Sequence, residues 1–367
     1  MIVLEATYGR SSKEVPMSII GGLDVHRAQI TFDWVDRDSG ETHRGRIAPA
    51  TRATLRGWLS GLPRVEGAFA VEGCTGWRFV VEELQAAGFL AHLAEPAETS
   101  SLRGPKRRAK TDRTDARLLR ELLEQGRLPC SWIPPGWILD LRTTVRLRKT
   151  LVDQRTAWQQ RIHAVLFHHG LPRPTQELLA PASRAWLEGV TLPSASRQAL
   201  AVALGQIDHL DAELDPIDRW LRTLARRQLG CRALMASHYG IGAITAPTIL
   251  AELGDARRFA GGAQVVRATG LDITVYASDG KRSPGRLSRQ GPEVLRWALF
   301  EAAKAAARPS SPDYAYYQQV KARQGGNRAT LAVARKLVRR VRHTLLALGD
   351  AALAPVEGLP RILPEAA

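Results

Sequence analysis

The sequence contains very little cysteine and no long hydrophobic run. Its 367 residues include only three cysteines, Cys74, Cys130 and Cys231, and no Cys-x-x-Cys pair. This scarcity excludes a disulfide scaffold and a zinc site built on cysteines, and it is typical of proteins of the reducing cytoplasm. No apolar stretch reaches the roughly 18–20 residues that span a bilayer. The segment Met1–Ser18 carries scattered charges and lacks the apolar core of a signal peptide. We therefore expect a cytoplasmic protein without a membrane partner.

Acidic residues are also scarce relative to basic ones. The chain has 52 Lys and Arg against 36 Asp and Glu, which gives a net charge of +16. The excess is local, because residues 101–150 hold 13 basic and five acidic side chains and residues 281–350 hold 15 and four. Two basic regions on a near-neutral body indicate surfaces for a polyanion, either a nucleic acid or an anionic membrane. Two solvated charged faces are the alternative.

Residues 18–125 have the pattern of an α/β domain. Three short apolar segments separated by turn signals predict a meander of strands, after which helical and strand patterns alternate. The expected strands are Ile19–His26, Ile30–Val35, Thr42–Ile47, Ala68–Glu72 and Phe89–Leu93, the last one ended by Pro96. The expected helices begin at Thr51, cover Gly76–Ala87 and, after a basic loop at Arg103–Lys110, cover Asp112–Leu123.

The middle of the chain, residues 140–228, has a helical pattern. A helix is expected over Arg142–His168, followed by a Pro-rich break over Gly170–Ser196. A heptad pattern then predicts an antiparallel helical hairpin, with coiling against a second chain as a further possibility. Asp215-Pro216 lies inside this pattern, so we expect a kink or a break there. The heptad residues are Ile207, Leu210, Leu214, Ile217, Leu221 and Leu224.

Residues 232–350 predict a third, mostly helical domain. Two helices within Met235–Leu253 flank the turn Tyr239-Gly-Ile-Gly242, and a Gly- and Ser-rich segment covers Gly261–Gly291. Two amphipathic helices follow, and the C-terminal residues resemble a frayed tail. The helices are expected at Glu293–Ala307 and Asn327–Leu348, and the tail at Ala351–Ala367.

Four carboxylates form the first candidate site. Asp24 and Glu72 end two predicted strands, and Asp112 and Asp115 lie three residues apart on a predicted helix, so that they share one face. Acids at the ends of apolar strands are costly unless a cation neutralises them, and carboxylate oxygens suit Mg²⁺ or Mn²⁺. Two such ions can clamp the oxygens of a phosphodiester. Taken singly, each acid also fits a turn, an ion pair or a helix-dipole role, and the nearby His26 fits a ligand or a solvated neighbour.

Basic loops and a glycine turn form the second group of candidates. A serine in a basic loop can attack phosphorus when its hydroxyl is activated, although most loop serines are turn residues. Glycines of a tight turn let backbone N–H groups approach a phosphate, although they also serve ordinary helix–helix turns. The candidate nucleic-acid-binding residues are Arg107, Arg108, Lys110, Gly240, Gly242, Lys281, Arg282, Arg286 and Arg289.

These motifs together resemble a known family. The segments Gly22-Leu-Asp-Val-His26, Val71-Glu-Gly73 and Lys110-Thr-Asp-Arg-Thr-Asp-Ala116 are similar to the DEDD transposases of insertion-sequence family one-ten, also called bridge recombinases. Tyr276-Ala-Ser278 and Leu287-Ser-Arg-Gln-Gly291 resemble the C-terminal domain of that family. The motifs occur in order over residues 19–345, although Tyr239, Ile273 and Pro292 depart from the common pattern.

The resemblance implies a fold, a site and an activity. It implies an RNase H/RuvC-like N-terminal domain with Asp24, Glu72, Asp112 and Asp115 as metal-binding catalytic acids, and a C-terminal domain with a helix-hairpin-helix element. The coiled-coil middle between them is predicted by the heptad pattern itself. It also implies a serine nucleophile, which aligns with Ser278, with Ser283 and Ser288 as rivals.

We therefore expect a DNA recombinase that moves its own element. It would act through a phosphoserine intermediate on donor and target DNA, as a homodimer or homotetramer, with a structured guide RNA and in association with a bacterial nucleoid. A RuvC-like endonuclease that uses water, and a non-catalytic nucleic-acid-binding protein, are the alternatives.

Overall fold

The computed structural model divides the chain into two compact units at Ile133/Pro134. It describes residues 17–359 except 64, 103–110, 173, 175, 275, 279–280 and 284, and for residues 276–278 and 281–283 it describes the backbone alone. We call residues 17–133 the N-terminal unit and residues 134–359 the C-terminal unit. The expected basic loop with Arg107, Arg108 and Lys110 lies outside the described residues.

The N-terminal unit is a six-stranded mixed sheet with helices on both faces. The strand order is β3-β2-β1-β4-β5-β6, with β1–β3 antiparallel, β1, β4 and β5 parallel, and β6 antiparallel to β5. The strands are β1 Ile19–Val25, β2 Ile30–Asp36, β3 Thr42–Ile47, β4 Gly67–Glu72, β5 Leu90–Ala94 and β6 Cys130–Ser131. The helices are α1 Arg52–Ser60, α2 Trp77–Ala86, α3 Pro96–Ser101 and α4 Asp112–Glu124.

This arrangement confirms the expected meander followed by alternating helices and strands. It is also consistent with the RNase H-like domain that the resemblance implies. Two short elements were not expected. Pro96 occupies the first position of α3 and does not simply end a strand, because a proline at the first helical position lacks only an N–H that would be unpaired anyway. The two-residue strand β6 is too short to show a periodic pattern.

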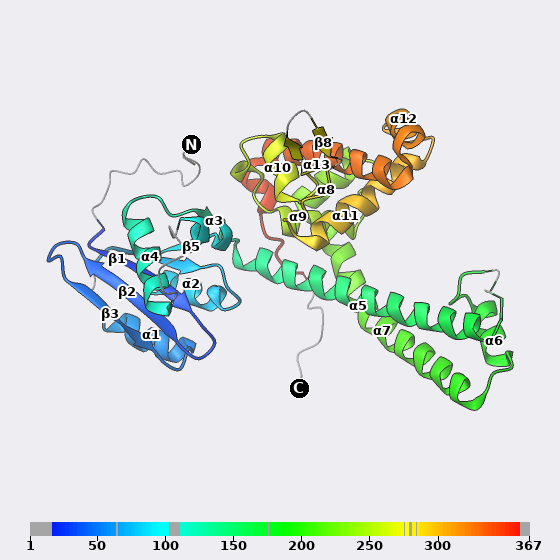
Figure 1. Ribbon diagram of the computed structural model, residues 1–367, viewed down its shortest axis with the longest axis horizontal. Coiled ribbons are helices and arrows are strands. Elements are labelled where there is room, and N and C mark those ends of the chain that lie inside the picture. Colours follow the sequence, from blue (N-terminus) through cyan, green and yellow to red (C-terminus); the bar gives the residue numbers. More distant parts are fainter. Residues whose placement is uncertain are drawn as a thin grey trace. The chain divides into compact units, whose positions relative to one another are not determined.

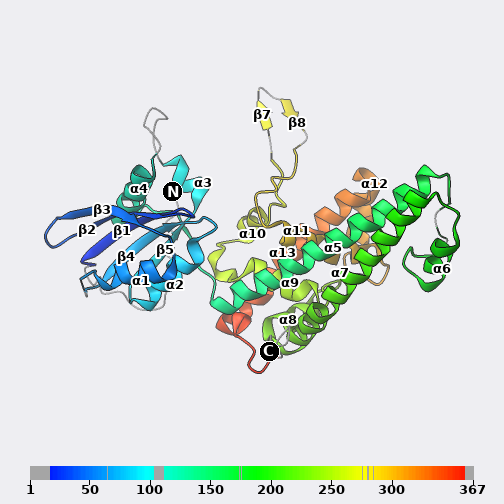
Figure 2. The same cartoon turned by 90° about the horizontal axis from the view of Figure 1, so that it is seen from below.

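The two faces of the sheet are packed differently. α1 and α2 cover one face with a large apolar cluster that includes Leu23, Phe69 and Val71, whereas α4 covers the other (Figure 2). On the α4 face the strands carry small residues, and a Cβ at Gly22 would lie 2.1 Å from the carbonyl oxygen of Ala116. α4 therefore lies on β1 at a distance that only glycine permits.

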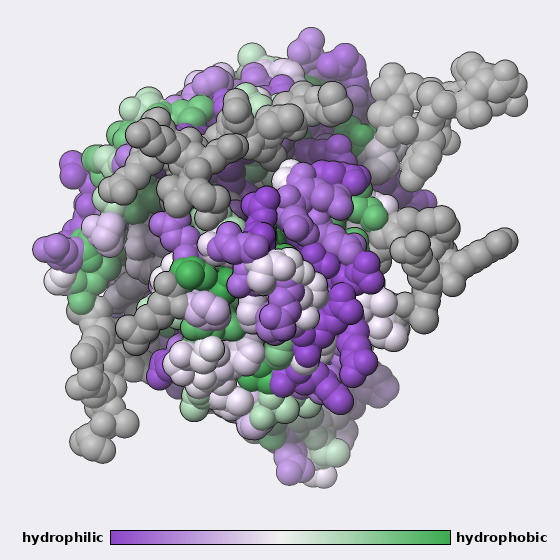
Figure 3. Space-filling view, turned by 90° about the vertical axis from the view of Figure 1, so that its left-hand side faces the viewer, coloured by the Kyte–Doolittle hydropathy of each residue, from purple (hydrophilic) through white to green (hydrophobic). Residues whose placement is uncertain are grey.

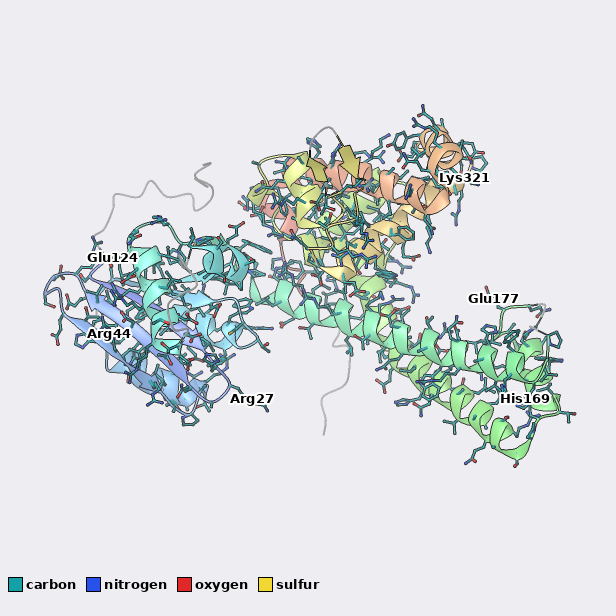
Figure 4. The ribbon with its side chains drawn as sticks, in the orientation of Figure 1. Arg27, Arg44, Glu124, His169, Glu177 and Lys321 are labelled. Atoms are coloured by element: carbon teal, nitrogen blue, oxygen red, sulfur yellow. The ribbon has the colours of Figure 1, made fainter. Side chains whose placement is uncertain are left out.

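A chain of ion pairs fixes α4 on the sheet. Arg120 of α4 is 8% exposed and donates from Nε to buried Asp33 of β2 at 2.5 Å. Arg44 of β3 donates to the other oxygen of Asp33 at 2.7 Å, and Arg120 Nη1 donates to Glu124 at 2.9 Å. Figure 4 labels the two outer members, Arg44 and Glu124. This network sets the position of the helix that carries Asp112 and Asp115.

The C-terminal unit begins with a long antiparallel hairpin, α5 Gly136–His168 and α7 Ser194–Arg227 (Figure 1). All six heptad residues of α7 are buried and belong to apolar clusters or core positions shared with α5, such as Val145 and Ile162. The heptad pattern thus serves packing within the chain, as expected for a hairpin. A dimer contact of this region would have to use other residues.

Two expectations for this unit were wrong, and a third was wrong in part. The Pro-rich segment Gly170–Ser196 contains α6 Pro181–Gly189 and the start of α7, since prolines are well placed before or at the first helical residue. α7 is one continuous helix through Pro216, so of the expected kink or break the break is absent there. The tail expected from Ala351 begins with a 3-10 turn at Gly349–Leu353, in which Ala352 is buried and its carbonyl accepts a hydrogen bond from Gln228 at 2.8 Å.

The rest of the C-terminal unit is a helical body with one projecting β-hairpin. Its helices share a core that includes Leu250, Leu299 and Val338, and β7 and β8 stand away from it (Figure 2). The helices are α8 Leu229–Ser237, α9 Thr245–Leu253, α10 Gly262–Ala268, α11 Glu293–Lys304, α12 Tyr314–Gln324 and α13 Gly326–Leu348, and the strands are β7 Tyr276–Ser278 and β8 Lys281–Ser283. α12 was not expected, and its apolar side chains indeed follow no clear helical period.

The surface of the described chain is consistent with its composition. Hydrophilic residues cover most of the face drawn in Figure 3, and the hydrophobic residues there form small separate areas. No helix among the described residues is long and apolar enough to cross a membrane.

We predict that Gly22→Ala destabilises the N-terminal unit by about 1–3 kcal/mol, because the new methyl group forces α4 away from β1. Gly57→Ala in α1 is the matched control. A Cβ at Gly57 meets nothing within 4 Å, so alanine should stabilise this helix slightly. Urea denaturation of both variants measures the difference. Equal stability of the two variants would contradict the close contact.

Candidate functional site

The strand alternation directs two of the candidate acids to the same face of the sheet. Successive side chains of a strand point to opposite faces. In β1, Leu23 packs into the cluster under α1 and α2, and in β4 Val71 does the same. Leu23 and Val71 are neighbours in the parallel register, so Asp24 and Glu72, the next residues, both lie on the α4 face. They also lie at the carboxyl ends of their strands.

The start of α4 brings the other two acids to this place. Thr111 caps the helix in a capping box, in which the Thr114 N–H donates to Thr111 Oγ1 at 3.3 Å and the Thr111 N–H donates to Thr114 Oγ1 at 3.0 Å. Asp112 and Asp115 therefore occupy the first turn, where the helix dipole favours carboxylates.

His26 contacts both the end of β1 that carries Asp24 and the start of α4 that carries Asp112. His26 Nε2 lies 3.1 Å from Asp24 Oδ2 and 3.5 Å from Asp112 Oδ1. Gln29 Nε2 donates to the other carboxylate oxygen of Asp112 at 3.1 Å. The side chain of Asp24 is only 3% exposed, whereas those of His26 and Asp112 are 52% and 46% exposed. Asp24 therefore forms the buried side of the site, and His26 and Asp112 form its solvent-exposed side.

Burial and neighbouring acids perturb Asp24. Desolvation by burial raises the pKa of Asp24 to about 6 from its ordinary 3.8, the charge and hydrogen bond of His26 lower it, and the charges of Glu72 and Asp115 raise it further. Glu72 and Asp115 thus act on the charge of Asp24. A cation would relieve the cost of ionising Asp24.

The ligand atoms of Asp24, His26 and Asp112 lie within 4.8 Å of one another and can hold a metal ion. The donor set of two carboxylates and one imidazole fits a divalent cation, and the raised pKa of the buried Asp24 supports the fit. Among the described residues, Glu72 and Asp115 act on the charge of Asp24 but do not belong to this three-residue group.

The candidate serine lies at the end of β7. Ser278 pairs with Lys281 across the turn of the hairpin, and the rival Ser283 pairs with Tyr276 at its other end. The side chains of Ser278, Lys281 and Arg282 are outside the described structure. The third rival, Ser288, donates its hydroxyl to Asp272 in a short hydrogen bond. The Ser288 hydroxyl is thus already hydrogen-bonded within the C-terminal unit.

The glycine turn between α8 and α9 is explained by packing. Gly240 has φ 92°, and a Cβ there would lie 2.2 Å from the carbonyl oxygen of Ala302 in α11. The Gly242 N–H donates to Thr245 Oγ1 at 2.8 Å. This pattern favours the ordinary helix–helix turn over a phosphate-binding turn at these two residues.

Sequence reasoning missed Gln29 and left His26 undecided. The spacing of His26, two residues after Asp24 at the end of a strand, places both side chains on one face and could have favoured a shared site. Gln29 carries no such signal, because its contact with Asp112 joins segments 83 residues apart in the chain.

The sequence matches two protein-family models. Residues 21–169 match a model of DEDD transposases of the IS110 group, and residues 232–318 match a model described as "Transposase IS116/IS110/IS902 family". The first match contains all four candidate acids, and the second contains the β7–β8 hairpin.

Curated relatives agree with these matches. A probable family 20 transposase of Pseudomonas aeruginosa is 26% identical over 78% of this chain and 83% of its own length. The transposase for insertion sequence element IS1111A of Coxiella burnetii is 24% identical over 89% of this chain and 88% of its own. A putative transposase of Sinorhizobium fredii is 30% identical over 55% of this chain and 49% of its own.

We predict that Asp24→Asn makes the stability of metal-free protein less dependent on pH. Since the pKa of Asp24 in the folded state, about 6, lies above the ordinary 3.8, folded protein keeps a proton between these pH values that the unfolded chain has lost. Stability therefore falls as pH rises through this window, by about 3 kcal/mol in total. Asparagine removes that loss, so the variant should be the more stable protein at pH 7.5 but not at pH 4.

Urea denaturation in EDTA at these two pH values measures the effect. Asp38→Asn, at an exposed turn residue, is the control and should leave the pH dependence unchanged. A loss of stability in Asp24→Asn that is the same at both pH values would contradict the raised pKa.

Proposed function

The chain belongs to the IS110/IS116 family of DEDD transposases, and from this premise we propose that it cuts and rejoins DNA strands to move an insertion sequence. The observation that carries the proposal is the group of Asp24, His26 and Asp112 at the strand ends, with Glu72 and Asp115 acting on Asp24. A group of acids that includes the buried Asp24 is costly to ionise unless it holds a cation.

Asp24, His26 and Asp112 would hold a divalent cation, Mg²⁺ or Mn²⁺, and Glu72 and Asp115 would add negative charge around it. When bound, such a cation stabilises charge on the attacking and leaving oxygens of a phosphodiester. The protein residues supply orientation: Gln29 holds one oxygen of Asp112, and buried Asp24 presents its carboxylate from a fixed strand.

Ser278 is the proposed nucleophile. Its Oγ attacks the scissile phosphorus, so that a serine–phosphate bond forms and the bond from phosphorus to one deoxyribose oxygen breaks. The serine proton passes to a base and the leaving oxygen takes up a proton. Attack by the hydroxyl of another strand reverses these steps and releases the serine, so that no phosphodiester is lost by hydrolysis.

A structured RNA is the proposed source of sequence specificity, and a homodimer or homotetramer the proposed assembly. The basic regions 101–150 and 281–350 suit nucleic-acid backbones but carry no base-specific pattern. Base pairing to a bound RNA would supply the missing selectivity. Full recombination by RNA-free protein would contradict guidance, and sedimentation of the complex with two DNA duplexes measures the assembly.

We predict that Asp24→Ala and Glu72→Ala each reduce strand cleavage at least ~100-fold, because charge on the reacting oxygens loses its stabilisation. The assay uses purified protein, RNA from the element and both DNA substrates, with and without EDTA. Asp38→Ala at the exposed turn is the control and should cleave normally. Undiminished cleavage by either acid variant, or in excess EDTA, would contradict the metal-dependent mechanism.

We also predict that Ser278→Ala binds nucleic acid normally but forms no covalent adduct with DNA. A denaturing gel with labelled DNA detects the adduct. An adduct that persists in Ser278→Ala and disappears in Ser283→Ala would move the nucleophile to Ser283. Cleavage without any adduct in the unaltered protein would favour an endonuclease that uses water.

A further inference from the structure

A large basic groove lies at the base of the β7–β8 hairpin. Its volume is about 1050 Å³, and it is lined by the segment around Ile273 and Gly285–Arg289 together with α12 and α13. Figure 4 shows α12, on which Lys321 is labelled. The lining residues that the structure describes include no Asp or Glu and five arginines: Arg286, Arg289, Arg323, Arg328 and Arg335.

These arginines differ from those of the protein that pair with buried acids. Arg120, Arg146 and Arg340 each pair with a buried acid, Asp33, Glu252 and Asp313 respectively. Within the described residues none of the five groove arginines has such an ion pair; Arg335 donates to the Leu271 carbonyl at 2.7 Å and Arg323 to that of Gln319 at 3.3 Å. Five guanidinium groups that form no ion pair among the described residues repel one another, and a polyanion would relieve that repulsion.

The backbone around the groove also favours an anion. The first turn of α13 has no acidic residue and no side-chain cap, and Arg328 stands in it. A cation is unfavourable at the positive end of a 23-residue helix unless a negative group lies nearby. Arg289 has φ 56°, a left-handed conformation that a residue with a side chain rarely adopts and that occurs often at ligand sites.

Apolar side chains line the same groove and indicate which polyanion fits. Ile273 is 48% exposed, and Leu287, Tyr316 and Leu331 are half-buried in the groove wall. A duplex presents phosphates and sugars to such a wall, whereas a single strand also presents unstacked bases. Arginines that follow a backbone, next to aromatic and aliphatic side chains, are typical of single-strand binding.

We propose that this groove binds a single-stranded stretch of DNA beside the hairpin that carries Ser278. The inference rests on the proposed function, because DNA is chosen as the strand that Ser278 would cut. The legs of the hairpin are joined at the groove, where the Thr274 N–H donates to the Arg286 carbonyl at 2.8 Å. From Ile273 to Ser278, five residues of extended chain span at most about 17 Å, so a strand in the groove lies within reach of the hairpin.

The test compares two double variants of the full chain that lose the same charge. Arg323→Gln/Arg328→Gln removes two exposed groove arginines, and Arg219→Gln/Arg226→Gln removes two exposed arginines of α7 in the same unit. Fluorescence anisotropy in EDTA measures binding of a labelled 12-nucleotide DNA strand, the matching duplex and the matching RNA strand, at several salt concentrations. Circular dichroism verifies that both variants fold.

The groove variant should bind the DNA strand at least ~10-fold more weakly, and its salt slope should fall by about 1.4 for two lost phosphate contacts. The α7 variant should bind within ~2-fold of the unaltered protein. Tyr316→Ala should weaken binding roughly tenfold while Tyr316→Phe retains it, because stacking needs the ring and not the hydroxyl.

Equal weakening by both double variants would overturn the groove site, and a loss confined to the duplex or to the RNA strand would overturn the single-stranded DNA occupant. Binding in EDTA does not depend on the metal-dependent chemistry. Normal groove binding in a protein that cleaves no DNA would therefore contradict the proposed function alone, and active protein without groove binding would contradict this inference alone.

Discussion

The close contact between α4 and strand β1 at Gly22 is the constraint on which the candidate metal site depends. A side chain at this position would meet the backbone of α4 at 2.1 Å, so the helix lies directly on the strand that carries Asp24. The buried Arg120–Asp33 pair then holds the helix in register, and breaking such a pair costs about 3–5 kcal/mol. As a result, the first turn of α4 presents Asp112 and Asp115 to the ends of β1 and β4.

In the C-terminal unit, the long helices α5 and α7 position the other elements through their contacts. The buried heptad residues of α7 pack against α5. α5 in turn holds the helical body, because Arg146 pairs with the fully buried Glu252 of α9 at 2.7 Å and Arg142 donates to the Ala251 carbonyl at 2.7 Å. These contacts attach the helical body, which carries the β7–β8 hairpin and the groove, to α5.

Each unit gathers side chains of like charge: acids in the N-terminal unit and arginines in the C-terminal unit. In the N-terminal unit, burial and the neighbouring acids Glu72 and Asp115 raise the pKa of Asp24, so that its ionisation is unfavourable without a cation. In the C-terminal unit, five arginines share one groove without ion pairs among the described residues. Each arrangement costs stability in the empty protein and is relieved by binding, which is the expected signature of sites for a divalent cation and for a nucleic-acid backbone.

The sequence by itself determined the strand meander, the alternation that follows it and the helical remainder, since these depend on local periodicity and capping. Spacing also predicted that Asp24, Glu72, Asp112 and Asp115 form one site, and the structure groups Asp24 and Asp112 with His26. The tertiary structure decided what depends on contacts between distant segments: that His26 and Gln29 contact Asp112, that the heptad residues pack within the chain, and that Arg323, Arg328 and Arg335 meet Arg286 and Arg289 in one groove. No local pattern records such contacts, because the distance between two side chains across the fold is set by how whole elements pack.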